Sequence, residues 1–151
     1  MREYILGARK ASGGQIDLLA ALAEYLKQYQ ANYGIHTELA VAPGLSVEAF
    51  EPLVQAQLLR IIQEALTNTR KHARARRVVV RLERRDAMAR ATIEDDGAGF
   101  DPTSQRAEAS GHYGLRFMQE RAHEVGGSVA VRSSPGEGTV VVVEVPVSGE
   151  Q

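Results

Sequence analysis

Residues 52–73, PLVQAQLLRIIQEALTNTRKHA, form the stretch that decides the fold. Their apolar side chains recur with a helical period, and Pro52 suits the first turn of a helix. The apolar positions that fall on one face are Leu58, Leu59, Ile62, Ala65, Leu66, Thr69 and Ala73. The stretch therefore predicts one long helix with a buried face.

Downstream of this helix the apolar period changes to two, which is typical of strands. Polar residues and glycines fill residues 95–111, a loop long enough to suggest a function in so small a domain. A helix at 115–125 then stops at Gly126 and Gly127. The strands predicted on this side cover residues 78–84, 88–94, 128–133 and 139–146, with turns at 85–87 and 135–138.

Upstream, residues 15–33 carry apolar side chains at helical spacing, and this pattern ends at Gly34. Residues 35–42 alternate and precede Pro43 and Gly44, which favours a strand followed by a turn. Several strands and about three helices, segregated along the chain, predict an α+β fold. We expect a two-layer sandwich with the helices on one face of a mixed sheet.

Composition limits the classes of function. The chain of 151 residues is long enough for one domain with its own core. Its 18 basic and 19 acidic residues leave a net charge of -1, which gives no global field for nucleic acid or anionic lipid. The lack of cysteine excludes disulfides, thiolate zinc sites and a thiol nucleophile, and fits a reducing cytoplasm. No stretch approaches the roughly 20 apolar residues that span a bilayer, and the start of the chain does not resemble a signal peptide.

Four polar residues border the apolar face of the long helix: Glu64, Asn68, Lys71 and His72. On a regular α-helix this spacing puts all of them on one stripe. A carboxylate, an amide oxygen, an ammonium and an imidazole can together orient water, ligate a hard divalent cation and neutralise phosphate oxygens. The alternative is a solvated face with side-chain pairing along the helix.

Glycine-bearing segments follow in the second half of the chain. Asp95 and Asp96 precede Gly97 and Gly99, where the backbone can approach a flat ligand closely; the alternative is a tight Asp-Gly turn. Residues 111–115 come directly before a helix, whose free N–H groups favour anions, although many such starts are only hinges. Residues 136–139 would ordinarily form a hairpin turn that leads into a strand.

In order and spacing these segments resemble the N, G1 and G2 boxes and the closing Gly-Thr strand of the ATPase superfamily that gyrase, Hsp90, histidine kinases and MutL share. The residue sequence within these segments is similar to that of the nitrate-sensor and DesK branch of sensor histidine kinases. The stretches concerned are QEALTN at 63–68, KHA at 71–73, DDGAGF at 95–100 and HYGLRFMQERA at 112–122. The resemblance covers about residues 35–147 and rests on several motifs that agree.

The resemblance implies the left-handed sandwich called the Bergerat ATPase fold, with ATP between the helices and a flexible lid at residues 101–113. Asp95 would accept from the adenine amine, and Thr139 would share the water network at that point. Gly97 and Gly99 would shape the adenine pocket.

The same resemblance assigns the phosphate end of ATP to the long helix and to the start of the next one. Asn68 would ligate Mg²⁺ through its side-chain oxygen. Glu64 would sit near the metal or polarise an incoming imidazole. The remaining implied contacts to ATP are Lys71, His72, Gly111, His112, Tyr113, Gly114 and Leu115.

A histidine kinase also needs a phosphoryl acceptor, which lies on a dimerisation helix and is followed by an acidic residue. None of His36, His72, His112 and His123 matches that pattern. The resemblance therefore implies an ATP-binding catalytic domain that does not phosphorylate itself, with its acceptor on a dimerisation domain of the same protein outside this chain. The expected division is 1–13, a dimerisation-helix tail and linker; 14–148, the ATP-binding domain; and 149–151, a tail.

The implied partners follow from the same kinship. A response regulator of the LuxR or NarL type would receive the phosphoryl group, and the full-length kinase would be a homodimer while the isolated domain is monomeric. We expect a cytoplasmic domain, within a protein that is either membrane-anchored or cytosolic. We expect no nucleic-acid partner, because the arginines between residues 70 and 85 are spread without interleaved aromatic residues.

Other functions compete with this one. A serine kinase of the anti-sigma-factor type shares the fold and the ATP site, but the wording at 112–122 favours a histidine kinase. A nucleotide-sensing module without transfer chemistry is disfavoured by the presence of Glu64, Asn68 and Asp95. Closer kinship to gyrase or Hsp90 would require long additional segments that this chain lacks.

Overall fold

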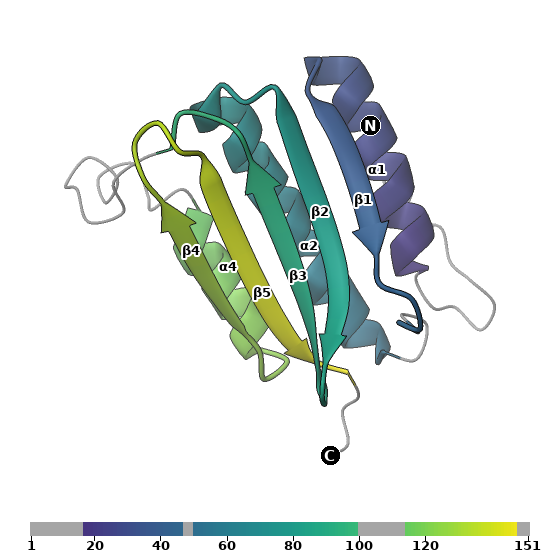
Figure 1. Cartoon of the computed structure of the whole chain (residues 1–151). Coiled ribbons are helices and arrows are strands. Elements are labelled where there is room, and N and C mark those ends of the chain that lie inside the picture. The colour runs from purple at the N-terminus through teal and green to yellow at the C-terminus, as the bar shows by residue number, and fades with distance from the viewer. Residues whose placement is uncertain (1–16, 47–49, 100–113, 148–151) are drawn as a thin grey trace.

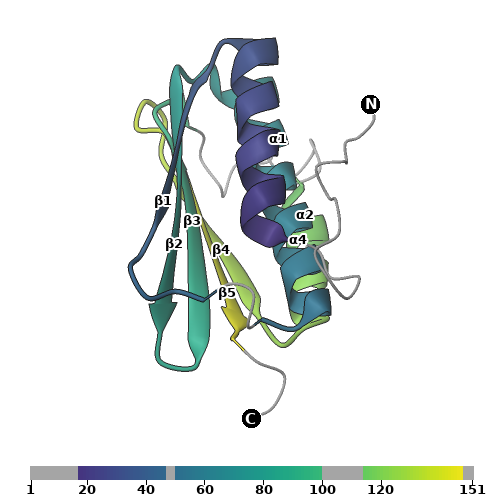
Figure 2. The ribbon, with the colours of Figure 1, turned by 90° about the vertical axis from the view of Figure 1, so that its right-hand side faces the viewer.

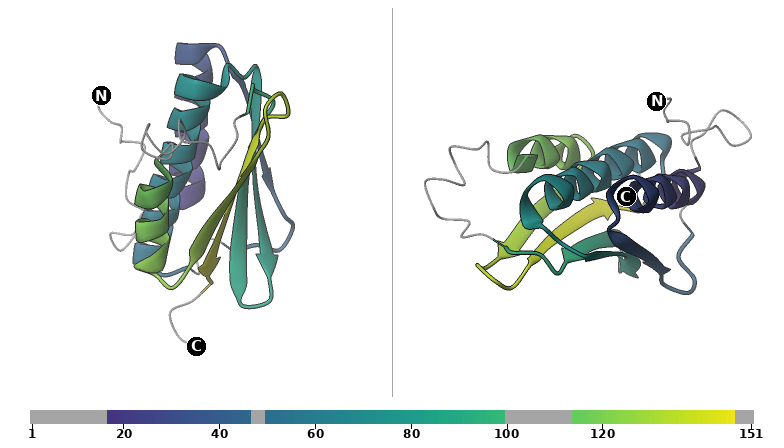
Figure 3. Two further views of the ribbon diagram at one scale, coloured as in Figure 1. Left: turned by 90° about the vertical axis from the view of Figure 1, so that its left-hand side faces the viewer. Right: turned by 90° about the horizontal axis from the view of Figure 1, so that it is seen from above.

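The protein folds into two layers, a sheet and a layer of helices (Figure 1, Figure 2). The structure is a computed structural model, and it describes residues 17–46, 50–99 and 114–147. In the described part, α1 (Leu18–Tyr33), α2 (Pro52–Asn68) and α4 (Leu115–His123) all cover the same face of the sheet (Figure 3). The expected α+β sandwich with helices on one face is confirmed.

The sheet is mixed and has five strands in the order β1-β2-β3-β5-β4. The edge strand β1 (His36–Val41) pairs parallel to β2 (Arg77–Arg85), because a helical crossover joins them. All other pairs are antiparallel: β2 with β3 (Met88–Asp95), β3 with β5 (Thr139–Pro146), and β5 with β4 (Ser128–Ser133). The register sets Asp95 directly opposite Thr139, so two predicted site residues are cross-strand neighbours.

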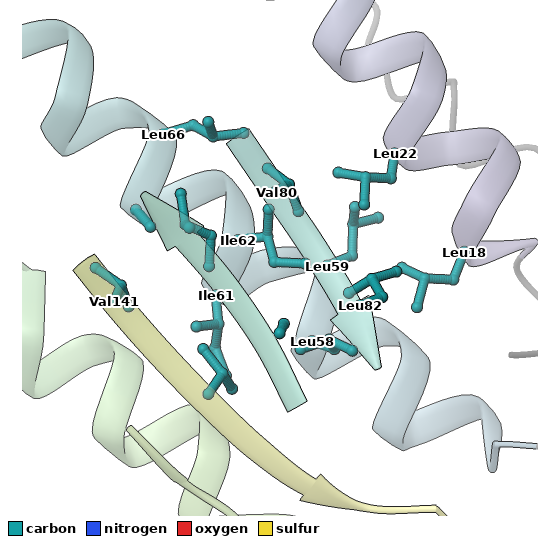
Figure 4. Packing of buried hydrophobic residues seen from close by; sticks show 14 of the residues in the cluster. Leu18, Leu22, Leu58, Leu59, Ile61, Ile62, Leu66, Val80, Leu82 and Val141 are labelled. Atoms are coloured by element: carbon teal, nitrogen blue, oxygen red, sulfur yellow. The ribbon is translucent and has the colours of Figure 1, made fainter. Parts of the chain in front are cut away.

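The core lies between α2 and the sheet. Leu58, Ile61, Ile62 and Leu66 of α2 are almost fully buried and meet inward side chains of β2 and β5, while Leu18 and Leu22 of α1 close the adjoining side (Figure 4). The sheet alternates buried and less buried positions along β3 and β5, as a strand with one covered face does. This alternation is the reason that the predicted strand bounds agree closely with the observed ones.

Local signals fix the ends of the helices. The Asp17 side chain accepts from the backbone N–H of Ala20 at 3.1 Å and starts α1. At the other end Gly34 takes the left-handed conformation, with φ of 70°, and its N–H donates to the Gln30 carbonyl. The helix predicted at 15–33 is therefore described from Leu18, and that predicted at 115–125 ends at His123.

The helix predicted at 52–73 differs from the observed one in its last turn. The α-helix ends at Asn68, and Thr69–Ala73 form the wider π-helical turn η4, which Arg74 closes in the left-handed conformation. The buried Tyr29 hydroxyl of α1 donates to the Leu66 carbonyl at 2.7 Å, just before the change. The α-helical spacing on which a common stripe was predicted therefore holds for Glu64 and Asn68, whereas Lys71 and His72 lie on the π turn.

None of the helices in the described ranges has the length and apolar character needed to cross a bilayer.

Candidate functional site

Asp95 is a buried carboxylate at the end of β3, where the strand meets α2 and η4. It follows Ala89, Ala91 and Ile93 in the inward-facing series, and only 8% of it is exposed. Its Oδ1 accepts from the Gly97 N–H at 2.8 Å, and its Oδ2 accepts from the Thr69 hydroxyl at 3.1 Å. Burial raises the pKa of Asp95, and hydrogen bonds from Gly97, Thr69 and the Thr139 backbone oppose that shift. Several donors thus hold one buried acceptor group in place.

Asp96 has a different role from Asp95. It is exposed, and its Oδ1 accepts from the backbone N–H groups of Arg76 and Arg77 at 2.8 and 3.0 Å. These two bonds lower the pKa of Asp96, the one from Arg76 having the larger effect. Asp96 therefore anchors the chain where it leaves η4 and enters β2, and its carboxylate is occupied by that task.

The loop after Asp95 packs against the β4–β5 hairpin through glycines. Gly99 has φ of 70°, and a Cβ built on it would lie 2.0 Å from the Ser134 carbonyl oxygen. Gly138 has φ of 77°, and its Cβ would lie 2.2 Å from the Asp95 carbonyl oxygen. Real Cβ atoms essentially never come that close, so both backbones need glycine here. Residues 136–139 are therefore more than an ordinary hairpin turn, since they hold the backbone of Asp95.

Hydroxyl groups from both sides of the hairpin meet beside this contact. The Ser133 hydroxyl lies 2.8 Å from the Thr139 hydroxyl and 3.0 Å from the Gly138 carbonyl oxygen. Thr139 thus lies next to Asp95 by its register in the sheet and next to Ser133 by its side chain. The predicted pair of Asp95 and Thr139 is brought together.

Glu64 lies on α2 against the start of α4. A Cβ built on Gly114, which has φ of 75°, would lie 2.1 Å from Glu64 Oε2. The carboxylate therefore packs against the Gly114 backbone, and any side chain at residue 114 would displace it. Leu115 follows, half-buried against the core.

Asn68, half-buried, follows Glu64 by one helical turn, and Lys71 is exposed on η4. His72 belongs to the same π turn, but its side chain lies outside the described part, as do Gly111, His112, Tyr113 and the predicted lid at 101–113. The described residues thus form two groups, Glu64 with Gly114 and Thr69 with Asp95. Both lie on the C-terminal half of α2 and its π turn, about 7–8 Å apart along the helix axis.

Thr69 and Ser133 are polar members of the site that sequence reasoning missed. Thr69 lies on the apolar stripe of the long helix, which predicts a core position, and it is buried at 4% exposure. Its hydroxyl nevertheless faces Asp95. A threonine within an apolar stripe, directly after Asn68, is the signal that could have found it.

The residues fit a nucleotide-bound magnesium ion better than a metal held by the protein alone. Among the described residues no three His, Asp or Glu side chains gather into a metal site. Magnesium at a nucleotide takes only one or two protein ligands, with phosphate oxygens and water completing its shell. Glu64 and Asn68, one turn apart on α2, offer oxygen donors of that kind.

Two of the arginines beyond η4 form ion pairs between exposed side chains of the sheet. Arg77 pairs with Glu38 at 2.9 Å, and Arg81 pairs with Glu94 at 3.0 Å. This arrangement agrees with their interpretation as surface charge.

The sequence of the chain is similar to those of known sensor histidine kinases. Over its whole length the chain is 32% identical to 38% of the signal transduction histidine-protein kinase/phosphatase DegS of Brevibacillus brevis. Over 86% of its length it is 35% identical to 22% of an uncharacterized sensor-like histidine kinase of Chloroflexus aurantiacus. The chain thus spans less than half the length of either relative.

Solved structures share the fold at lower identity. The histidine kinase domain of the blue-light activated histidine kinase from Erythrobacter litoralis matches 95% of this chain and 67% of its own, with a TM-score of 0.68 and 24% identity. The mycobacterial sensor histidine kinase MprB matches 87% of this chain and 95% of its own, with a TM-score of 0.64 and 22% identity.

Residues 53–149 match the family described as "Histidine kinase-, DNA gyrase B-, and HSP90-like ATPase". This range includes α2 from its second residue, the Asp95 loop, α4 and the closing hairpin, on which the candidate site lies. The chain therefore belongs to the family of histidine kinase-, DNA gyrase B- and HSP90-like ATPases.

Proposed function

We propose that this chain is the ATP-binding catalytic domain of a two-component sensor histidine kinase. It donates the γ-phosphate of ATP to a histidine on a dimerisation domain that lies outside this chain. The observation that carries the proposal is the buried Asp95 carboxylate, held as an acceptor between Thr69, Gly97 and the closing hairpin, in a chain of this ATPase family. The names of its relatives, which are histidine kinases, point the same way.

At the base end of ATP, Asp95 accepts from the exocyclic amine of adenine. This role is supported by its burial and by the acceptor capacity that a carboxylate keeps beyond its bonds from Gly97 and Thr69. Thr139 joins the water network at that point, and Gly97 and Gly99 allow the base to approach the backbone. A nucleobase with an amine at this position satisfies the site.

At the phosphate end, Asn68 would ligate the magnesium ion that accompanies ATP, and Glu64 would assist that ion or orient the incoming imidazole. Magnesium, when bound, neutralises charge that develops on the phosphate oxygens. The exposed ammonium of Lys71 adds positive charge there. His72, Gly111, His112, Tyr113, Gly114 and Leu115 complete the proposed contacts.

Phosphoryl transfer needs positioning and charge neutralisation more than covalent help from the protein. Residues on α2 and η4 bind the two ends of ATP separately. Thr69 and Asp95 fix the base, while the side chains of Glu64 and Asn68 meet the reacting end. The nucleophile, an imidazole nitrogen, comes from the dimerisation domain.

The wider assignments belong to the same proposal. Residues 14–148 form the ATP-binding domain, between the tail of a dimerisation helix with its linker at 1–13 and a short tail at 149–151. The kinase belongs to the nitrate-sensor and DesK branch, acts in the cytoplasm as a homodimer, and passes its phosphoryl group to a LuxR- or NarL-type response regulator. The isolated domain is monomeric.

Titration calorimetry with ADP and a non-hydrolysable ATP analogue, with and without Mg²⁺, tests nucleotide binding. We expect binding of both, and no phosphorylation of the isolated chain by labelled ATP. Addition of the histidine-bearing dimerisation domain from the same gene should restore phosphorylation in trans. Absence of binding heat at millimolar nucleotide would refute the ATP site, and a serine phosphate on an added partner would favour an anti-sigma-type kinase.

Two substitutions separate the ends of the site. Asp95→Asn should weaken nucleotide binding itself, because it replaces a charged acceptor of the amine. Asn68→Asp should lower Mg²⁺-dependent transfer in the intact kinase more than it lowers nucleotide affinity. Unchanged ADP affinity in Asp95→Asn would contradict the adenine assignment.

A further inference from the structure

We propose that Thr69 is a positioning residue that determines base specificity, because its hydroxyl holds the Asp95 carboxylate as an acceptor for a nucleobase with an exocyclic amine. The inference rests on the proposed nucleotide function and deepens it. No motif of the sequence pointed to Thr69, since it lies on the apolar face of the helix.

The geometry gives the hydroxyl a choice of two acceptors. Thr69 Oγ1 lies 3.1 Å from Asp95 Oδ2 and 3.2 Å from the Ala65 carbonyl oxygen, one turn earlier on the helix. A threonine hydroxyl has a single proton to donate. The ionised carboxylate is the stronger acceptor, so the proton goes to Asp95 while that group is charged.

The bond limits where Asp95 can accept from a ligand. The two oxygens of a carboxylate offer about four acceptor positions. Donors from Gly97, Thr69 and the Thr139 backbone occupy three of them. About one position is left, and its direction is set by the other three.

A base that presents an N–H group at that position completes the shell of Asp95. A base that presents a carbonyl oxygen there brings two acceptors together and leaves both unsatisfied, which a buried site penalises. Without the Thr69 hydroxyl, Oδ2 has a second free position and the carboxylate can turn. Loss of the hydroxyl should then weaken the discrimination between bases rather than the stability of the fold.

Thr67 provides a matched control on the same helix. Its hydroxyl donates to the Gln63 carbonyl at 3.0 Å, and it is half-buried. Thr67→Val therefore removes a hydroxyl and adds a methyl group, as Thr69→Val does, without touching the Asp95 carboxylate. Thr69→Ser keeps the hydroxyl and removes only the methyl group.

The experiment measures ADP and purine riboside 5′-diphosphate, which lacks the amine, against the 151-residue chain by calorimetry. Thr69→Val should lower ADP affinity by about five- to twentyfold, the loss expected for a hydrogen bond to a charged group, and change affinity for the amine-free analogue by less than about twofold. Thr69→Ser and Thr67→Val should bind both nucleotides like the wild type.

Equal loss for the two nucleotides, or no loss for either, overturns the role of Thr69 while leaving the ATP site intact. A wild-type chain that binds neither nucleotide refutes the proposed function instead. Thermal unfolding of each variant comes first, and Thr69→Ala replaces Thr69→Val if the valine variant does not fold.

Discussion

Gly138 and Gly136 lie in one turn and allow a test of how closely the hairpin holds Asp95. Both have positive φ, 77° and 81°, so an alanine at either position suffers the same kind of backbone strain. The two positions differ in the space available for a Cβ atom. A Cβ on Gly138 would lie 2.2 Å from the Asp95 carbonyl oxygen, whereas a Cβ on Gly136 meets nothing within 4 Å.

The expected cost of each alanine follows from these contacts. A left-handed conformation costs an L-residue about 1–2 kcal/mol, of which about 0.4–1 kcal/mol is recovered because alanine restricts the unfolded chain. Gly136→Ala should therefore lower the free energy of unfolding by about 1 kcal/mol. Gly138→Ala adds an overlap with backbone atoms that cannot rotate away, and overpacking typically costs about 1–3 kcal/mol more.

Chemical denaturation at equilibrium measures the difference between the two variants, and ADP titration measures its effect on the site. Gly138→Ala should be less stable than Gly136→Ala by about 1–3 kcal/mol, which is about 2–12 °C in Tm for a domain of this size. It should also bind ADP more weakly, because the backbone of Asp95 must shift, while Gly136→Ala should bind like the wild type. Equal stability of the two variants would refute the reasoning.

Further predictions address other contacts. Tyr29→Phe removes the hydrogen bond from the buried Tyr29 hydroxyl to the Leu66 carbonyl and should lower the free energy of unfolding by about 1–3 kcal/mol. Tyr33→Phe should change it little, because Tyr33 is 47% exposed. Gly114→Ala should displace the Glu64 carboxylate and lower phosphoryl transfer in the intact kinase more than ADP affinity, as parallel transfer and calorimetric assays can test. Burial raises the pKa of Asp95 above its ordinary value of 3.8, so the stability that its protonated form contributes is present below that pH and lost as the pH rises through the folded pKa; Asp95→Asn should lack this pH dependence. The Arg76 and Arg77 N–H groups lower the pKa of Asp96, so its contribution is present above about pH 4 and lost as the pH falls; Asp96→Asn should be less stable at pH 7, and denaturation curves between pH 3 and 7 check both signs.

The strands and the helix faces could be predicted because one side of each element is buried. In β3 the inward residues Ala89, Ala91 and Ile93 alternate with more exposed ones, and in α2 the buried residues follow the helical period. Local signals such as Asp17 and Gly34 then limited α1 to within a few residues. Burial on one side imposes a periodic pattern of apolar residues, and this pattern can be recognised in the sequence.

The π turn could not be predicted, because its cause is not local. Residues 69–73 continue the apolar pattern of α2, and nothing among them demands a wider turn. The contacts that accompany it come from α1, distant in the sequence: the Tyr29 hydroxyl on the Leu66 carbonyl, and the Tyr33 ring 4.6 Å from the Arg70 guanidinium carbon. Contacts of this kind, between residues far apart in the sequence, cannot be inferred from the residue types of the turn itself.

The two aspartates at the end of β3 show how far the same reasoning extends to the site. Asp95 is the last residue of β3 and keeps the alternation of the strand, whereas Asp96 follows the strand. The buried series through Ile93 therefore places Asp95 inward, where Thr69 and Gly97 hold it. Asp96 is left to the edge, where it binds the backbone of Arg76 and Arg77. The period of the strand thus decides which carboxylate is available to a ligand. The donors that hold Asp95 depend instead on which helix residue lies opposite it, which is set by the packing of α2 on the sheet.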